Sequence, residues 1–351
     1  MVDSENAQAA TGLSKAEGSW ATMGDVARQA GVSKITVSRV LRQPDRVKPD
    51  TRDRVRAAIR ELGYVPDDAA SAFSSRKSRT VGALISTLDG STFASTVDGL
   101  SDALREAGFQ LLISTTEYSP QTEADNLTTL LGRRPDGLVL TSTEHTPAAR
   151  TLMARLGLPV VELWDLPEEP IDCAVGFSNF DSGAAMTHFL FERSYRRPAF
   201  VGSQSGSDTR VTKRMDGYLA AVRERGLGDG RVVRLSTGGS KAIERGAKGL
   251  ARLLERWPDT DAVFCSSDSV ALGVLNEARR RGLRVPEDIA VAGYGDFDFA
   301  GPYGLELTTL RIPGYEIGTA AAALILERTR NPEASSVSAD VGFKIIKRRT
   351  A

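Results

Sequence analysis

The chain has 351 residues, of which 41% are apolar and 26% charged, as in globular proteins of two or three domains. Its formal net charge is 0, yet residues 21–80 carry 13 Lys and Arg against 7 Asp and Glu. Such a basic head on a mildly acidic body indicates that the head binds a polyanion. No apolar run approaches the ~18 residues of a membrane span, and the N-terminus lacks a signal-peptide core, so we expect a cytoplasmic protein without membrane contact.

Cysteine and histidine are scarce. Cys173 and Cys265 lie far apart in apolar, strand-like runs, and His145 and His188 are the only histidines. This distribution argues against a disulfide framework and against a zinc site, because no cluster of these residues has metal-ligand spacing. We therefore expect two buried thiols, no metal and no cofactor.

Residues 21–66 are expected to form a helical DNA-binding domain after a disordered tail, residues 1–20. Cap residues and glycines predict three helices. The first spans Met23–Ala30, the second runs from Ser33 to about Leu41, and the third runs from Pro49 to Leu62. On the second helix one face is apolar, whereas the outward positions are Lys34, Ile35, Ser38 and Arg39. This spacing predicts a helix-turn-helix unit, although Ile35 has the alternative of packing against the third helix.

Residues 67–79 are small and polar around one large apolar side chain, Phe73. A helix this short is unstable alone. We expect a hinge that becomes ordered only against DNA or against a second copy of the chain.

From residue 80 the pattern alternates between apolar strands and helices, which predicts an α/β core with parallel sheets. The expected strands are Val81–Ile85, Gln110–Ser114, Gly137–Thr141, Val160–Trp164, Cys173–Phe177, Pro198–Gly202, Val232–Leu235, Ala262–Ser266 and Ile289–Tyr294. Nine strands suit two lobes: residues 80–180 with 311–330, and residues 181–310 with 331–351. A last helix, Glu316–Arg330, and a last strand, Val341–Lys347, are expected to cross back between them.

Residues 22–33 (TMGDVARQAGVS), 36–41 (TVSRVL) and 61–66 (ELGYVP) resemble the head of the lactose/galactose repressor (LacI/GalR) family. The resemblance continues through residues 136–140 (DGLVL) and 285–294 (VPEDIAVAGY) and covers residues 22–347. It implies a two-lobed, periplasmic-binding-protein-like core and a homodimeric regulator, most simply a repressor, that binds a pseudo-palindromic operator in double-stranded DNA. The segments HTP (145–147), PVVEL (159–163) and AVGFSNF (174–180) resemble the gluconate-operon repressors, which implies a sugar-acid effector.

The resemblance also implies which residues of the head meet DNA. Lys34, Ile35 and Arg39 would reach base edges, because Lys and Arg suit guanine acceptors and Ile suits a thymine methyl group. Phosphate contacts are expected from the hydroxyl residues Thr22, Ser33, Thr36 and Ser38. Hinge contacts are expected from Ala70 and Phe73. The family inserts a leucine where this chain has Phe73, which leaves open how deeply the ring enters the minor groove.

The effector is expected between the lobes, at the carboxyl ends of the strands. Arg214 and Asp268 match effector-contacting positions of the family, and Asp296, Glu162 and Thr141 follow or end predicted strands. We expect Arg214 to face the three carboxylates and to pair with the carboxylate of the effector. Apolar faces for the sugar are expected from Phe93 and Trp164. The alternatives are a salt bridge within its own helix for Arg214, a turn cap for Asp296, and core packing for the two aromatic residues.

Other functions fit the sequence less well. Within the family, the alternatives are a regulator of another sugar or an activator. A periplasmic-type sugar-binding protein would share the two lobes but not the basic head. An enzyme is not expected, since residues 202–206 (GSQSG) mimic a nucleophile elbow with glutamine at its centre, and there is no phosphate-binding loop.

Overall fold

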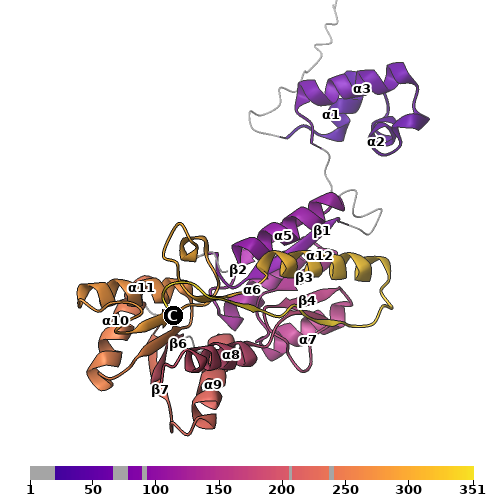
Figure 1. Cartoon of the computed structure of the whole chain (residues 1–351). Coiled ribbons are helices and arrows are strands. Elements are labelled where there is room, and N and C mark those ends of the chain that lie inside the picture. The colour runs from indigo at the N-terminus through magenta and orange to yellow at the C-terminus, as the bar shows by residue number, and fades with distance from the viewer. Residues whose placement is uncertain (1–19, 66–77, 89–92, 205–207, 237–240) are drawn as a thin grey trace, which may run out of the picture. The chain divides into compact units, whose positions relative to one another are not determined.

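The computed structural model describes residues 20–65, 78–88, 93–204, 208–236 and 241–351 (Figure 1). The chain divides into two compact units, Met1–Arg76 and Lys77–Ala351, and each is considered by itself. The tail and hinge expected from the sequence lie outside the described residues, apart from Trp20, Ser78 and Arg79.

The first unit contains the three expected helices, α1 (Met23–Ala30), α2 (Lys34–Arg42) and α3 (Pro49–Leu62), with a short 3-10 turn at Pro44–Arg46. Thr22 and Asp25 form a capping box at the start of α1, and Ser33 caps α2 by accepting from the N–H of Thr36. Both α1 and α3 end at a glycine with positive φ. The apolar stripes close on a small core made of Val26, Ala27, Ala30, Val37, Val40, Val55, Ala58 and Tyr64. The local signals therefore placed these helices correctly.

The first lobe of the second unit is built on a parallel sheet with strand order β11-β5-β4-β3-β1-β2. In that order the strands are Ser338–Asp340, Cys173–Gly176, Val160–Leu163, Gly137–Leu140, Thr80–Ile85 and Gln110–Thr115. Helices α5 (Ala94–Glu106) and α12 (Gly314–Arg330) pack together over one face, and α6 (Pro120–Leu131) and α7 (Pro147–Leu156) cover the other (Figure 1).

The second lobe has the parallel strand order β7-β6-β8-β9. These strands are Arg231–Ser236, Pro198–Gln204, Ala262–Cys265 and Ala290–Ala292. Helices α8 (Asn179–Glu192) and α9 (Thr209–Glu224) pack as one pair, and α10 (Ala242–Arg256) and α11 (Asp268–Arg280) as the other (Figure 1). The α/β class with two parallel sheets is confirmed.

The C-terminal segment corrects the expected lobe boundary. The sequence pattern places residues 331–351 in the second lobe, but β11 pairs with β5 in the sheet of the first lobe. The strand expected at Val341–Lys347 is shorter in the structure and begins only at Lys344, after a turn in which Gly342 has a positive φ and its N–H bonds to the side chain of Asp340. The chain then crosses as β12 (Lys344–Ile346), antiparallel to β10 (Thr309–Arg311), and only its last residues reach the second lobe.

Cys173 and Cys265 are free and buried, and burial raises the pKa of each thiol. Among the helices that the structure describes, none combines the length and the apolar character that crossing a membrane requires.

Candidate functional site

The outward face of α2 is the candidate DNA-reading surface. Lys34, Ile35 and Arg39 are exposed, and Ile35 retains 71% of its accessible surface. The alternative in which Ile35 packs against α3 is therefore wrong, since a side chain in that core would be covered. Thr36 and Ser38 lie half-buried on the same helix, and the hydroxyls of Ser33 and Thr36 are 3.0 Å apart. The hydroxyl of Thr22 donates to Asp25, while Ala70 and Phe73 lie outside the described residues.

The start of the second unit is held by a residue that the sequence reasoning missed. The carboxylate of Asp136 accepts hydrogen bonds from the backbone N–H groups of Ser78 (3.2 Å) and Arg79 (2.7 Å). Asp136 begins the DGLVL segment, and a carboxylate directly before a buried strand is the feature of the sequence that could have indicated this role. Asp136 fixes the point at which the chain enters the core.

Arg214 on α9 lies in the interior between the lobes and is only 7% exposed. Its Nη1 donates to Oδ1 of Asn179 (2.8 Å), and its guanidinium carbon lies 4.0 Å from the centre of the Tyr294 ring. Its Nε is buried and has no hydrogen-bond partner in the described part of the chain. The alternative of a salt bridge within α9 is not observed, because its contacts are made by a neutral amide and an aromatic ring.

Arg210, one helical turn before Arg214, connects the lobes and was also missed. Its Nη1 donates to the carbonyl of Thr141 (2.7 Å), and its Nε donates to Asp208 (3.0 Å). The guanidinium lies over the rings of Phe93 and Tyr118, at 5.2 and 5.8 Å. This brings two predicted residues, Phe93 and Thr141, into contact with α9 where the two lobes meet. Burial raises the pKa of Tyr118 to about 12, so its hydroxyl stays protonated.

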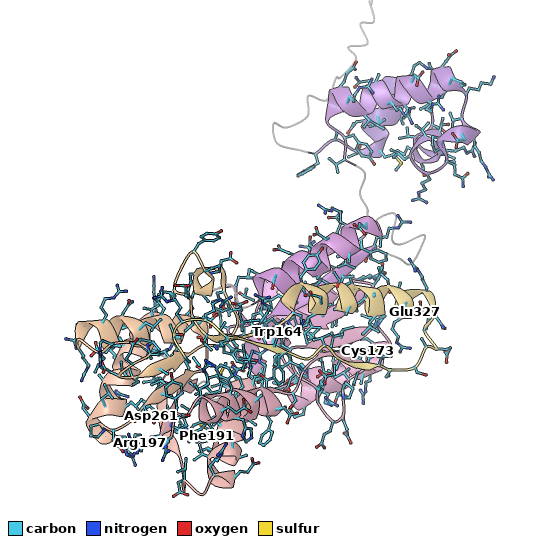
Figure 2. All side chains as sticks on the ribbon, viewed as in Figure 1. Trp164, Cys173, Phe191, Arg197, Asp261 and Glu327 are labelled. Carbon is cyan, nitrogen blue, oxygen red and sulfur yellow. The ribbon has the colours of Figure 1, made fainter. Side chains whose placement is uncertain are left out.

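Trp164 lies at the junction of the lobes, where Figure 2 labels it. Its Nε1 donates to Thr96 (3.1 Å), and the rings of Phe93 and Phe177 meet it edge to face. It is 4% exposed and has a φ of 69°, which is uncommon for a bulky residue. The next residue, Asp165, pairs with Lys213 of α9 at 2.5 Å. Trp164 therefore packs as part of the hydrophobic core, as the alternative of core packing predicted.

The three carboxylates expected opposite Arg214 have other partners. Glu162 points to the face of its sheet covered by α6 and α7, where it accepts from His145 (3.2 Å) and from the N–H of Ile171. Asp268 accepts from the hydroxyl of Thr309 (2.6 Å) and from the N–H of Phe297 (2.8 Å). The expected facing arrangement is wrong, because each carboxylate already satisfies buried donors of its own neighbourhood.

Asp296 forms ion pairs with Arg311 and Arg348, both at 2.6 Å, so it does more than cap a turn. Burial raises the pKa of Asp268 to about 6, against the hydrogen bonds that it accepts, and the nearby charge of Asp296 adds to the rise. Asp268 and Asp296 therefore lie close to each other, in the part of the second lobe that adjoins β10.

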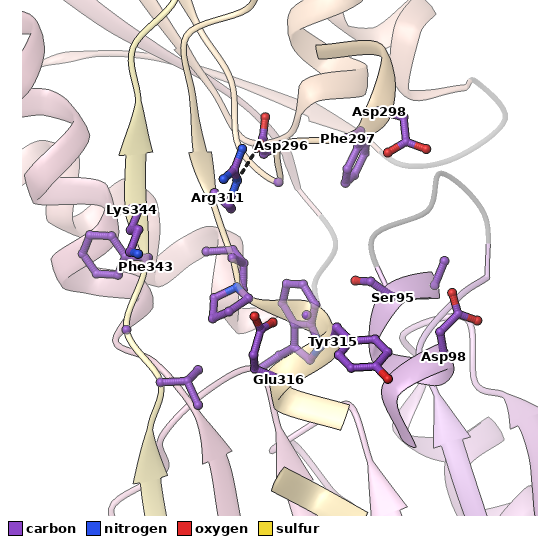
Figure 3. Close-up of a pocket in the computed structure, with 18 residues that line it drawn as sticks. Ser95, Asp98, Asp296, Phe297, Asp298, Arg311, Tyr315, Glu316, Phe343 and Lys344 are labelled. Carbon is purple, nitrogen blue, oxygen red and sulfur yellow. Dashed lines mark hydrogen bonds and ion pairs between the residues drawn. The ribbon is translucent and has the colours of Figure 1, made fainter. Parts of the chain in front are cut away.

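A cavity of about 730 Å³ adjoins this region (Figure 3). The first lobe contributes the start of α5, the start of α12 and Trp164, and the second lobe contributes residues 295–298. Residues 311–313 and 341–344, which connect the lobes, complete the lining. Of the predicted effector residues, only Trp164 and Asp296 line this cavity.

Known proteins match both units. Residues 22–67 match the family described as "Bacterial regulatory proteins, lacI family". Residues 78–346 match the family described as "Periplasmic binding proteins and sugar binding domain of LacI family". The HTH-type transcriptional regulator GntR of Pseudomonas aeruginosa is 36% identical over 330 residues, covering 94% of this chain and 95% of that protein. GntR of Escherichia coli K12 is 35% identical over 323 residues, covering 92% and 96%.

A solved structure of a LacI family regulator has a similar fold. The crystal structure of a LacI family transcriptional regulator from Silicibacter pomeroyi is 33% identical, with a TM-score of 0.86 over 94% of this chain and 99% of that chain. The relatives are transcriptional regulators, which confirms the prediction of a regulator rather than an enzyme. The chain therefore belongs to the LacI family, as a DNA-binding transcriptional regulator that carries the family's sugar binding domain.

Proposed function

We propose that this regulator is a homodimeric, cytoplasmic repressor that leaves a pseudo-palindromic operator when gluconate or a closely similar sugar acid binds between its lobes. Two kinds of observation support the proposal. Two relatives that match more than nine tenths of the chain are regulators called GntR, and the segments at residues 145–147, 159–163 and 174–180 resemble gluconate-operon repressors. The observation that carries the effector chemistry is the environment of Arg214.

A buried guanidinium without a carboxylate partner is costly unless a ligand supplies one. Arg214 is 7% exposed, its Nε has no hydrogen-bond partner among the described residues, and its guanidinium contacts the amide of Asn179 and the ring of Tyr294. A carboxylate accepts two parallel hydrogen bonds from one edge of a guanidinium, which a neutral sugar hydroxyl cannot do. Arg214 therefore favours an acid as the ligand. Phe93 and Thr141 are buried against Arg210, one turn before Arg214 on the same helix.

The contacts between α9 and the first lobe offer a route from effector to DNA. Arg210 joins α9 of the second lobe to the carbonyl of Thr141 in the first, and Lys213 joins α9 to Asp165. An effector that binds one arrangement of the lobes more tightly would shift the population towards it. The expected shift separates the hinges of the two protomers and so weakens operator binding.

On the DNA side, Lys34 and Arg39 would donate to base acceptors in the major groove and Ile35 would contact a thymine methyl group. The hydroxyl residues of the head, Thr22, Ser33, Thr36 and Ser38, would fix the register on phosphates. A single head covers too little DNA for a specific operator, so we assign one half-site to each protomer. Ala70 and Phe73 complete the proposed contacts at the centre of the operator.

The test is a calorimetric titration of the full chain with gluconate and, in parallel, with glucose. Gluconate should bind and glucose should not, because an arginine that forms no ion pair with a described carboxylate is left without one when the ligand is neutral. Arg214→Ala should abolish gluconate binding and keep operator binding, giving a repressor that gluconate cannot release. Arg223→Ala is the matched control, since Arg223 is exposed at the other end of α9.

The outcomes separate the competing functions. Equal binding of a neutral sugar and gluconate would contradict the sugar-acid assignment and favour a regulator of another sugar. Gluconate that strengthens operator binding in an anisotropy titration would contradict release. A response of Arg223→Ala as large as that of Arg214→Ala would show that the loss reflects the helix rather than the site.

A further inference from the structure

The point at which the chain enters the second unit is fixed from both sides. The carboxylate of Asp136 accepts from the N–H groups of Ser78 (3.2 Å) and Arg79 (2.7 Å), directly before β1. The carbonyl of Arg79 accepts from the N–H of Gln110 at the start of β2 (2.8 Å). The backbone N–H of Asp136 donates to the carbonyl of Thr80 (2.7 Å). These four hydrogen bonds are called the entry clamp below.

The entry clamp holds Arg79 in a conformation that an arginine rarely adopts. Its φ is 52°, in the left-handed region, where a side chain other than that of glycine meets steric resistance. The side chain of Arg79 is exposed, so burial in the core does not impose this backbone. The peptide groups on both sides of its Cα are hydrogen-bonded, which determines φ and ψ together. The direction in which the chain leaves the core at Ser78 therefore depends on the carboxylate of Asp136.

The second lobe contains the same arrangement at a position that leads to no other unit. Asp261, directly before β8, accepts from the N–H groups of Arg196 (2.7 Å) and Arg197 (2.8 Å), directly before β6. Figure 2 labels Arg197 and Asp261 in this lobe. There the chain arrives from α8, so the bonds fix one element of the core against another. At Asp136 the same bonds fix the residues through which the chain continues to the first unit, which contains the helix-turn-helix.

Pre-ordered residues at this point lower the free-energy cost of placing two heads on one operator. This step rests on the proposed homodimer, because a single head could bind its half-site from any orientation. Fixing the backbone of one residue costs conformational entropy equivalent to a factor of roughly 5–30 in an equilibrium constant. Because the entry clamp fixes Ser78 and Arg79 before DNA binds, operator binding does not have to supply that cost.

We propose that Asp136 is a positioning residue for operator binding. Without contacting DNA itself, it restricts the direction in which the segment to the head starts, and so raises the effective concentration of the second head at its half-site. Loss of the entry clamp leaves each head able to bind a half-site but reduces the benefit of binding both. This effect is opposite in sign to that of charge alone, since removing a carboxylate reduces the repulsion of DNA phosphates.

The test measures the operator advantage, defined as the affinity of the full chain for a complete operator divided by its affinity for a half-site. The complete operator is a pseudo-palindrome selected with the wild-type chain from a random DNA library, and the half-site is one arm of it. Asp136→Asn should leave the half-site affinity unchanged and lower the operator advantage about tenfold, because an amide oxygen replaces only one of the two carboxylate acceptors. Asp261→Asn is the matched control, since it perturbs the same two bonds in the second lobe, and it should keep the operator advantage.

Arg79 provides a second, charge-matched comparison. Arg79→Val and Arg79→Asn remove the same positive charge from an exposed position. Only the β-branched valine opposes a φ of 52°, because asparagine tolerates the left-handed region. Arg79→Val should therefore have an operator advantage at least about fivefold lower than that of Arg79→Asn. Urea unfolding of all four variants reports any loss of stability separately from the loss on DNA.

The proposal is overturned if Asp136→Asn keeps the wild-type operator advantage, if Asp261→Asn loses as much, or if the two Arg79 variants do not differ. A wild-type chain that binds the complete operator no more tightly than the half-site would contradict the homodimer, and this inference with it. Gluconate takes no part in the test, so an error in the effector assignment does not change its outcome.

Discussion

Replacing His145 by leucine is expected to destabilise the first lobe. It should also remove the decrease in the free energy of unfolding that the wild-type chain shows at alkaline pH. His145 lies between two carboxylates, with Nδ1 at 2.5 Å from Glu123 and Nε2 at 3.2 Å from Glu162. All three side chains are at most 2% exposed. A protonated imidazole donates to both carboxylates, whereas leucine would leave them buried together without a cation.

The size of the pH-dependent stabilisation follows from the pKa of the His145 imidazole. Burial alone would lower the pKa of His145, but the hydrogen bonds to Glu123 and Glu162 outweigh burial and raise the pKa from 6.5 to about 9. A shift of this size corresponds to about 3 kcal/mol. Because the folded state holds the proton more firmly, the stabilisation is complete below pH 6.5 and is lost as the pH rises through about 9. Removing one partner of a buried ion pair costs about 3–5 kcal/mol.

The assay is urea unfolding of the full chain between pH 6 and pH 10, followed by tryptophan fluorescence, to which the buried Trp164 contributes. The wild-type free energy of unfolding should fall by about 3 kcal/mol more than that of His145→Leu between pH 6.5 and pH 9. His188→Leu is the control, since His188 is 41% exposed and pairs with Glu224 at the surface. Parallel pH profiles for wild type and His145→Leu would refute the reasoning, as would an effect of His188→Leu of equal size.

Three further predictions concern DNA binding and packing. Lys34→Ala and Arg39→Ala should each lower operator affinity by about 1–3 kcal/mol and relax specificity at one operator position, measured by anisotropy on a set of operator variants; unchanged affinity in both would contradict the assignment of α2. Phe73→Ala should weaken operator binding and leave gluconate affinity nearly intact, whereas equal losses would place Phe73 in the folded core. Gly217→Ala should destabilise the core by about 1–3 kcal/mol or more in urea, because the new Cβ would lie 2.0 Å from the carbonyl oxygen of Phe180; an unchanged midpoint would show that α8 and α9 separate freely.

The sequence by itself determined the elements whose signals are local. Thr22, Ser33 and the glycines at positions 31 and 63 end or begin helices through bonds within a few residues, so the head helices could be predicted almost to the residue. The continuous apolar runs likewise predicted buried parallel strands. The resemblance of short motifs predicted the family, because those motifs encode a close helix crossing and an exposed reading face.

Only the tertiary structure decided which side chains meet across the core. Glu162 ends a strand as predicted, but strand alternation turns it towards His145, so it satisfies a buried imidazole rather than Arg214. Asp296 forms ion pairs with two arginines, one of which lies 52 positions further along the chain. Strand β11, with the sequence SAD, has no apolar run, and it joins the first-lobe sheet by parallel pairing with β5. These partners are distant in sequence and compete for the same buried polar groups, and only the assembled core determines which of them come within hydrogen-bonding distance.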